Sequence, residues 1–309
     1  MSHTVSRPTF IFAAIIATAC AQTDDDAASV PADTTAGAGA SLTSIADIGL
    51  ETPESVLYDE ASDIYIVSNI NGNPLDADGN GFISRIRPTG EVESLKWIDG
   101  EAEGVTLNAP KGMAIIGDTL FVSDIDNVRA FHRTTGAPLG ARAVSGASFL
   151  NDLAVGSDGA LYVTDTGMDA TFSATGTDAL HRFGASGAQA VATAPAVAAP
   201  NGIVADDSGM IVVGFASSVV QHFPADGGAP TDIATLPAGQ LDGVVRTSDG
   251  TLLISSWEGQ AIYRISPDGQ VSTVVEGLEA PADLGWDTRR HLLLIPLFNG
   301  NRIEIREIH

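Results

Sequence analysis

The chain has 309 residues, of which 44% are hydrophobic and only 17% are charged, and it contains 33 glycines. This is the composition of a globular protein with many turns, and the length suits one domain, although two would also fit. A nucleic-acid-binding protein needs basic patches, whereas this chain carries a net charge of −24. We therefore expect no nucleic-acid partner.

The first segment of the chain has the pattern of a targeting sequence. Arg7 precedes the apolar run 10–17, and small residues then lead to Cys20, the only cysteine. The run is too short to remain in a bilayer as a spanning helix and is typical of a signal peptide. Residues 17–20 (ATAC) resemble a bacterial lipobox, whose cysteine is lipidated, although Ala17 replaces the usual leucine. We expect residues 1–19 to be a lipoprotein-type signal peptide. The alternative is an ordinary signal peptide cleaved after Ala19 or Ala21.

Residues 20–40 contain no large hydrophobic side chain beyond Val30. Such a segment cannot bury enough apolar surface to fold and is predicted to be a disordered tether. Ala21 after the cysteine resembles the outer-membrane sorting pattern of bacterial lipoproteins. The sequence thus predicts an exported protein, periplasmic or tethered to the outer membrane, which touches the membrane only through a lipid anchor at Cys20.

A four-residue phrase recurs six times in the remaining sequence, at intervals of 40–57 residues. An apolar, β-prone run follows each copy, and a turn and a second apolar run come next. Repeats of this length made only of strands predict a β-propeller. The six copies are Thr52-Pro53-Glu54-Ser55, Ala109-Pro110-Lys111-Gly112, Phe149-Leu150-Asn151-Asp152, Ala199-Pro200-Asn201-Gly202, Gln240-Leu241-Asp242-Gly243 and Ala280-Pro281-Ala282-Asp283.

The repeat predicts an all-β domain over residues 41–309, a six-bladed β-propeller with four strands per blade. The expected blades are 51–98, 106–145, 148–195, 198–236, 239–276 and 280–308. The last blade reaches the C-terminus after its third strand, and residues 42–48 stand where a fourth strand would be needed. We expect this N-terminal strand to join the C-terminal blade, because a closed ring has no exposed strand edges.

The third position of the phrase suggests a functional site. Equivalent positions of different blades converge on the axis of a propeller, and the six copies carry Glu54, Lys111, Asn151, Asn201, Asp242 and Ala282 there. Four of these offer side-chain oxygens, two of them carboxylates, which is a hard ligand set for one divalent cation. Ca²⁺ is the first choice, with Mg²⁺, Mn²⁺ or Zn²⁺ as alternatives. In the alternative interpretation, Asn and Asp beside Gly simply form turns.

The phrases containing Glu54, Asn151, Asn201 and Asp242 resemble the gluconolactonase/senescence-marker-protein (regucalcin-like) family, with a more distant similarity to paraoxonases. The resemblance extends over residues 51–308. It implies that these four residues bind one catalytic divalent cation and that the protein hydrolyses a lactone or related ester. Sugar lactonases of the family commonly carry Arg two residues before the first Asn, where this chain has Phe149. The expected substrate is therefore a small lactone or ester that is less polar or less anionic than a sugar lactone.

The resemblance also implies a catalytic role for Asp242, which would be both cation ligand and general base and would take a proton from the attacking water. From its place in the repeat, Lys111 is a second candidate catalytic residue that would aid the oxyanion or bind the substrate. The alternative is a solvated lysine at the rim. No organic cofactor is expected, and the protein is expected to act as a monomer.

Two other functions fit the same repeat. One is a non-enzymatic propeller of the NHL-repeat kind that binds a partner, and the other is a propeller whose axial metal is only structural. Two carboxylates facing each other at the axis favour the metal-dependent enzyme over a pure scaffold.

Several further signals are weaker. Residues 76–81 resemble the first half of an EF-hand loop, but Arg87 stands where its closing glutamate would be. We expect an Asx-rich turn that could fold over the pocket, with a second calcium site as the alternative. His132, His181 and His222 recur at one repeat position and are expected on blade faces. Trp257 and Phe298 follow second strands, where they could line an apolar wall or pack between blades.

Overall fold

The structure is a computed structural model that describes residues 43–308. The compact unit that contains them spans Ser41–His309. The predicted signal peptide, tether and lipid anchor fall on residues 1–40, outside the described residues, and stay predictions. Within residues 43–308, no helix is long and apolar enough to cross a membrane.

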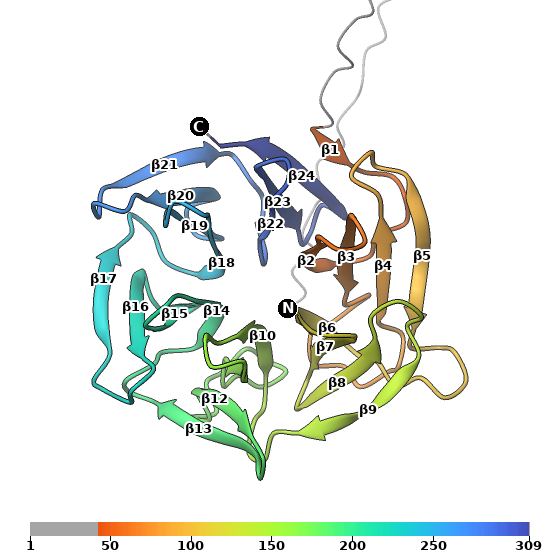
Figure 1. The fold of residues 1–309 in the computed structure, drawn as a ribbon, viewed down its shortest axis with the longest axis horizontal. Helices are drawn as coiled ribbons and strands as arrows, with labels where there is room; N and C mark the ends of the chain where they lie inside the picture. Colours follow the sequence, from red (N-terminus) through yellow and green to blue (C-terminus); the bar gives the residue numbers. More distant parts are fainter. Residues whose placement is uncertain (1–42, 309) are drawn as a thin grey trace, which may run out of the picture. The chain divides into compact units, whose positions relative to one another are not determined.

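Six four-stranded antiparallel sheets are arranged in a ring, which confirms the predicted six-bladed β-propeller (Figure 1). In five blades the strand order follows the chain, with the first strand nearest the axis and the fourth at the periphery. The first three blades consist of β2 (Pro53–Asp59), β3 (Ile64–Asn69), β4 (Phe82–Ile86), β5 (Val92–Asp99), β6 (Pro110–Ile116), β7 (Thr119–Asp124), β8 (Asn127–His132), β9 (Pro138–Ala143), β10 (Leu150–Val155), β11 (Leu161–Asp165), β12 (Ala179–Gly184) and β13 (Gly187–Thr193).

The second half of the ring repeats this arrangement. Its strands are β14 (Pro200–Ala205), β15 (Gly209–Gly214), β16 (Val219–Pro224), β17 (Thr231–Thr235), β18 (Leu241–Arg246), β19 (Leu252–Ser256), β20 (Ala261–Ile265), β21 (Val271–Glu276), β22 (Gly285–Asp287), β23 (Leu292–Leu297) and β24 (Arg302–Glu307).

The N-terminal strand closes the ring as predicted. β1 (Ser44–Ile45) pairs antiparallel with β24, with Ser44 opposite Glu304 and Ile45 opposite Ile303. It forms the outermost strand of the last blade, in the order β1-β24-β23-β22. The side chain of Ile45 is buried in a cluster with residues of the first and last blades. The two ends of the domain are thus held together by strand pairing and by apolar packing.

The hydrophobic core lies between neighbouring blades. One cluster, for example, joins Ile64 and Ile66 of β3 to Met113 of β6 and Leu120 of β7. Every residue of the second strands β3, β11, β15 and β19 is buried, whereas every residue of the outer strand β9 is exposed. Stability therefore comes from sheet faces packed against each other around the ring.

The repeated phrase forms the start of each of the first five inner strands. In β6, β14 and β18 the pairing register shifts within the phrase, which indicates a β-bulge at Pro110–Met113, Pro200–Ile203 and Leu241–Val244. Asn201-Gly202 and Asp242-Gly243 are thus strand residues, and the interpretation of these pairs as turn formers is wrong.

Glycine is required at the fourth position of the phrase in several blades, because the inner strands approach closely there. A Cβ atom on Gly112 would lie 2.5 Å from the Cα of Asp152 in the next blade. On Gly243 it would lie 2.6 Å from the Cα of Asp283. Such distances are far below van der Waals contact, so a larger residue would push the blades apart.

Buried hydroxyl groups of the second strands connect neighbouring inner strands. Thr164 Oγ1 accepts a hydrogen bond from the amide of Asp152 in its own blade (2.9 Å) and donates one to the carbonyl of Asn201 in the next (2.6 Å). Ser255 Oγ likewise accepts from the amide of Gly243 (2.8 Å) and donates to the carbonyl of Ala282 (2.9 Å). These bonds fix the fourth-position residue of one blade relative to the third-position residue of the next.

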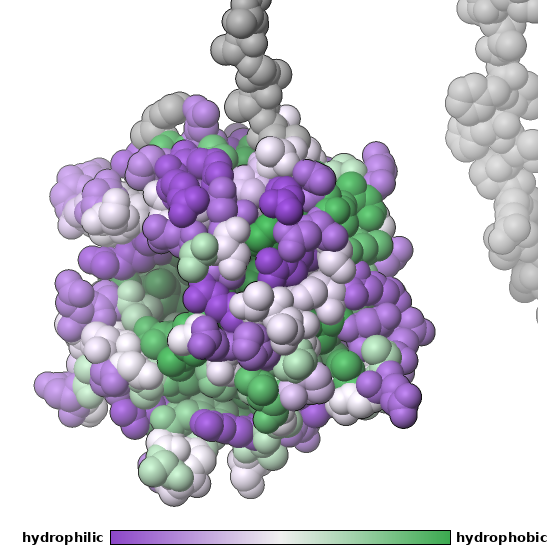
Figure 2. Space-filling model, turned by 45° about the vertical axis from the view of Figure 1, so that its right-hand side comes forward, coloured by the Kyte–Doolittle hydropathy of each residue, from purple (hydrophilic) through white to green (hydrophobic). Residues whose placement is uncertain are grey.

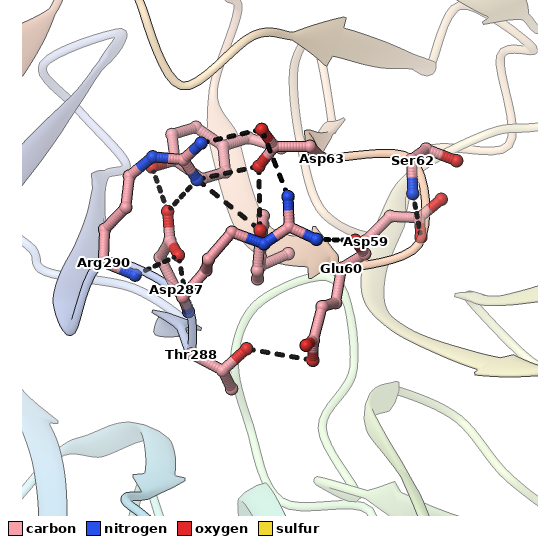
Figure 3. A network of polar contacts seen from close by, with 10 residues as sticks. Asp59, Glu60, Ser62, Asp63, Asp287, Thr288 and Arg290 are labelled. Atoms are coloured by element: carbon pink, nitrogen blue, oxygen red, sulfur yellow. Dashed lines mark hydrogen bonds and ion pairs between the residues drawn. The ribbon is translucent and has the colours of Figure 1, made fainter.

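A network of ion pairs and hydrogen bonds joins the first and last blades near the turns β2–β3 and β22–β23 (Figure 3). The Arg290 guanidinium donates to both carboxylate oxygens of Asp63 at 2.7 Å and to Asp287 at 2.9 Å. The buried Tyr65 hydroxyl donates to Asp287 at 2.7 Å. Charge-assisted bonds of this kind are stronger than isolated surface pairs, so the network adds to the closure of the ring.

The outer surface carries both hydrophilic and hydrophobic side chains. Figure 2 shows mainly hydrophilic side chains on this face, with hydrophobic ones in hollows and small patches between them. Most of the large exposed hydrophobic residues are isolated on strands or turns, such as Leu139 on β9 and Val191 on β13. Phe172, which lies in a loop beside the cavity described below, is the exception that bears on function.

We expect Asp63→Asn to weaken the seam between the first and last blades in a pH-dependent way. The Arg290 guanidinium and the Tyr58 hydroxyl lower the pKa of Asp63 to about 2. A carboxyl group with a depressed pKa stabilises the fold above its unfolded pKa and loses this contribution as the pH falls through the folded value. Asn tolerates the positive φ of 53° at this position.

Urea denaturation should show the variant less stable than wild type by about 1 kcal/mol at pH 7. The difference should shrink as the pH is lowered from about 4 to about 2. Asp207→Asn, at an exposed position, is the control and should change little. A difference that does not vary with pH would show that the charge of Asp63 is not what stabilises the seam.

Candidate metal centre and active site

The four predicted ligands and Lys111 lie around one cavity, at the end of the ring where the inner strands begin. The cavity has a volume of about 150 Å³. Each of the five is the second residue of its inner strand, in β2, β6, β10, β14 and β18. Ala282, the sixth copy, is fully buried and is not part of the cavity lining. The repeat position therefore brings Glu54, Lys111, Asn151, Asn201 and Asp242 together, as the sequence predicted.

All four candidate ligands are 3–4% exposed, and each has one buried side-chain oxygen without a hydrogen-bond partner. These oxygens are Glu54 Oε2, Asn151 Oδ1, Asn201 Oδ1 and Asp242 Oδ1. Buried acceptors without partners are rare, because each one loses its hydration without compensation. Four such oxygens around one cavity fit a bound cation, which would satisfy them together.

The orientation of one amide supports this arrangement. Asn151 donates from Nδ2 to the hydroxyl of Thr166 at 3.1 Å, which leaves its Oδ1 without a partner. Residues 43–308 contain no group of three His, Cys, Asp or Glu side chains placed to bind a metal ion. A cation here would therefore depend on two carboxylates and two amide oxygens, a set that suits Ca²⁺ or another hard cation.

Burial and mutual repulsion disturb both carboxylates. Removal from water raises the pKa of Glu54 well above its usual value, and the charges of Asp242 and Asp283 raise it further, while Lys111 opposes them. Burial also raises the pKa of Asp242, with Asp283 adding to the rise and the Trp257 side chain lowering it. A positive charge between Glu54 and Asp242 would relieve this strain.

Lys111 is buried and is not the solvated rim lysine that the sequence left open. Its side chain is 1% exposed, and Nζ donates to the carbonyl of Ala109 at 2.9 Å. Nζ also lies 4.9 Å from the centre of the Phe149 ring. Burial lowers its pKa to about 8, although the charges of Glu54 and Asp124 partly oppose this effect. Lys111 is thus the one cationic side chain among those that line the cavity.

Carboxylates at the ends of the second strands hold the chain just before the inner strands. Asp124 Oδ1 accepts from the amides of Asn108 (3.1 Å) and Ala109 (2.9 Å). Asp165 Oδ1 accepts from the amide of Phe149 at 2.9 Å. These bonds orient the approach to Lys111 and Asn151 and therefore set where those side chains enter the cavity.

The walls of the cavity are mainly apolar, and many of their side chains come from a second equivalent position of the blades. In five blades the residue directly after the second strand lines the cavity, and these residues are Ile70, Thr166, Phe215, Trp257 and Phe298. The sequence singled out Trp257 and Phe298 by this position but missed the others, which the same register would have found. Phe149 also lines the cavity, as do Pro74, Met168 and Phe172 from longer loops.

A second pair of buried carboxylates lies deeper along the axis. Asp152 and Asp283 border a cavity of about 380 Å³ that the inner strands enclose. Asp152 accepts from the amides of Leu153 (2.6 Å) and Ile203 (2.8 Å), and Asp283 accepts from the hydroxyl of Ser55 (2.5 Å). These carboxylates accept hydrogen bonds and have no buried oxygen without a partner, whereas Glu54 and Asp242 each have one.

The EF-hand-like segment and the recurring histidines lie outside the candidate site. In the EF-hand-like segment, Asp78 accepts from the side-chain amide of Asn80 at 2.7 Å, as in an Asx-rich turn. The three recurring histidines lie on β8, β12 and β16, and none of them is among the residues that line the cavity.

The family model described as "SMP-30/Gluconolactonase/LRE-like region" matches residues 53–282. A search of curated protein sequences finds no match. Solved structures with the same fold include a gluconolactonase from Xanthomonas campestris, with 19% identity, a TM-score of 0.64 and coverage of 83% of this chain and 87% of that one.

Two further solved structures also share the fold. A virginiamycin B lyase from Staphylococcus aureus has 14% identity and a TM-score of 0.58, over 83% of this chain and 95% of the other. A chain of a nidogen/laminin complex has 13% identity and a TM-score of 0.61, over 74% and 87%. At these identities the structural matches show the fold alone.

The electrostatics of the cavity predict that Glu54→Gln stabilises the metal-free protein. A carboxyl group whose pKa is raised on folding destabilises the fold once the pH exceeds its unfolded pKa. In EDTA at pH 8, thermal or urea denaturation should therefore show the variant more stable than wild type by about 1 kcal/mol or more. The advantage should disappear near pH 4, where both states carry the proton.

Asp207→Asn again serves as the control, with no such gain. A loss of stability for Glu54→Gln in EDTA at pH 8 would show that Glu54 is not under electrostatic strain.

Proposed function

The chain belongs to the SMP-30/gluconolactonase/LRE-like family, and on this premise we propose that it is a divalent-cation-dependent hydrolase of a lactone or related ester. Family membership supports a lactonase-type hydrolase in general. The observation that carries the dependence on a cation is the set of four buried oxygens without partners, one each from Glu54, Asn151, Asn201 and Asp242.

In this proposal Glu54, Asn151, Asn201 and Asp242 hold the cation, with Ca²⁺ as the first candidate. When bound, the cation supplies a Lewis acid for the substrate carbonyl. Asp242 takes the proton from the attacking water, since its carboxylate lines the cavity in which the water and the substrate would meet. The positively charged side chain of Lys111 lines the same cavity. It is suited to stabilise the negative charge that develops on the carbonyl oxygen of the substrate.

The apolar walls contribute by excluding water. Phe149, Phe215 and Trp257 line the cavity above buried polar groups. Electrostatic interactions are stronger in such a setting than in solvent, so the charges of Asp242 and Lys111 act with less screening.

The first test is hydrolysis of a panel of lactones and aryl esters by the purified full-length chain. Activity should be lost after EDTA treatment and dialysis, and one of Ca²⁺, Mg²⁺, Mn²⁺ or Zn²⁺ should restore it. Asp242→Ala should abolish turnover while the protein stays folded, whereas Asp207→Ala should keep wild-type rates. Full activity in Asp242→Ala would refute the assignment of that residue.

The same experiment separates the competing functions. A folded, cation-loaded protein that turns over no lactone or ester would favour a propeller that binds a partner or carries a structural metal. Activity that survives complete removal of the metal would contradict the proposed role of the cation.

Lys111→Met should separate catalysis from cation binding. Methionine keeps most of the volume of the buried side chain and removes its charge. We expect kcat/KM to fall about 10–100-fold, whereas cation affinity, measured by calorimetry, should be kept or improved because a nearby positive charge is gone. Unchanged kcat/KM would assign Lys111 a structural role only.

A further inference from the structure

The cavity carries an aromatic wall made by three successive blades. The rings of Phe215 and Trp257 meet edge to face with their centres 5.6 Å apart, and Trp257 and Phe298 are 5.2 Å apart. Each of the three residues directly follows the second strand of its blade, which fixes its place on the same end of the ring. Rings in such contact form one continuous apolar surface.

A second aromatic pair lies at the rim. Phe149 packs against Phe172 at 6.5 Å between ring centres, with the planes at 64°. Phe149 is 6% exposed, whereas Phe172 is 54% exposed although it lines the cavity. A ligand that enters the cavity would bury part of the exposed Phe172 ring, which is favourable for an apolar surface.

Hydrogen bonds within its loop hold Phe172 beside the cavity. Phe172 has a positive φ of 58°, which is unfavourable for a bulky residue. Asp169 Oδ1 accepts from the amides of Thr171 (2.8 Å) and Ser173 (3.1 Å), and Met168 and Ala174 form a β-bridge across the base of the loop. The loop thus keeps an unfavourable backbone conformation at a position where the side chain remains accessible.

Few polar side chains of the cavity remain for a substrate with many hydroxyl groups. The four candidate cation ligands are committed to the cation in the proposed function, and the Thr166 hydroxyl donates to the carbonyl of Pro200 (2.9 Å) while it accepts from Asn151 (3.1 Å). Lys111 uses one ammonium proton on a backbone carbonyl, and the buried Trp257 indole N–H has no partner among the described residues. These two donors suffice for the oxygens of one ester group, but the lining residues that the structure describes add no free acceptor for the hydroxyl protons of a sugar. Several buried hydroxyls of a sugar lactone would lose water without gaining partners, which disfavours their binding.

We infer that the site takes lactones or esters with an apolar substituent, an alkyl chain or an aromatic ring, rather than polyhydroxylated sugar lactones. This inference rests on the proposed function for the reacting group. The substituent packs on the wall of Phe215, Trp257 and Phe298 and passes under Phe172, which makes Phe172 and Trp257 residues that determine specificity.

Kinetics on a homologous series test the inference. With γ-lactones whose alkyl chain grows from none to six carbons, kcat/KM should rise roughly threefold per methylene until the wall is covered. It should exceed kcat/KM for glucono-δ-lactone. Phe172→Ser should lower the ratio of kcat/KM for the longest to the shortest lactone by about tenfold. Leu139→Ser, which removes an equally exposed residue (55%) from the outer strand β9, should leave the ratio unchanged.

A binding measurement without turnover separates this inference from the proposed function. An N-unsubstituted γ-lactam with a six-carbon alkyl chain keeps the ring and chain but resists hydrolysis. It should change the tryptophan fluorescence of the wild type in EDTA. Trp257→Phe should remove this change, and Phe172→Ser should weaken binding about tenfold relative to Leu139→Ser.

The possible outcomes are distinct. Lactam binding with this dependence, but no hydrolysis of any ester with any cation, would refute the proposed function and keep the ligand class. A rate that is independent of chain length, a preference for glucono-δ-lactone, or lactam binding that is insensitive to Phe172 and Trp257 would overturn the inference, whatever the hydrolase activity.

Discussion

The close approach of the inner strands around the axis is the constraint on which the rest of the structure depends. At Gly112, Gly202 and Gly243 an added Cβ would lie 2.3–2.6 Å from backbone atoms of the next blade. The blades can come this close only where the fourth position of the phrase is small or is hydrogen-bonded in place, as Ser55, Asp152 and Asp283 are. The bulges in these strands then present the third-position side chains to one cavity.

This convergence has an electrostatic consequence. It brings together the four buried carboxylates of Glu54, Asp152, Asp242 and Asp283, with Lys111 as the nearby positive charge. Burial raises the pKa of each carboxyl group, and the charge of Asp283 raises the pKa of Glu54, Asp152 and Asp242 further. Asp152 and Asp283 accept hydrogen bonds from amide and hydroxyl donors, whereas Glu54 and Asp242 each keep an oxygen without a partner. Oxygens without donors are therefore found at the cavity and not at the carboxylates deeper along the axis, which is the distribution that a cation site at the cavity requires.

Much of this could be predicted from the sequence, because the fold repeats. The period of the phrase predicts the number of blades, and the missing fourth strand of the last blade predicts the closing strand β1. The shared register predicts that Glu54, Asn151, Asn201 and Asp242 meet. The burial of Lys111 could not be predicted, since it depends on how tightly the blades pack. The place of Phe172 depends on a loop without repeat symmetry, and the donors to Asp152 and Asp283 come from neighbouring blades.

The two repeat positions that line the cavity divide its chemistry. The second residue of each of the first five inner strands lies in a register shift, between residues that are paired on either side. The Asp124 and Asp165 carboxylates hold the chain before two of these residues, and hydroxyl groups of the second strands bind the backbone beside others, so their side chains have little freedom. The residue after each second strand lies outside the ladder, and its side chain can change from Thr166 to Trp257 without altering a strand pair. The fold thus fixes where the third-position side chains lie, and the residue type in each blade decides whether an oxygen, a lysine or an alanine stands there. The side chains of the aromatic wall vary from blade to blade with less constraint from the strands. For this reason the inner strands support the proposed reaction, and the wall supports the proposed substrate.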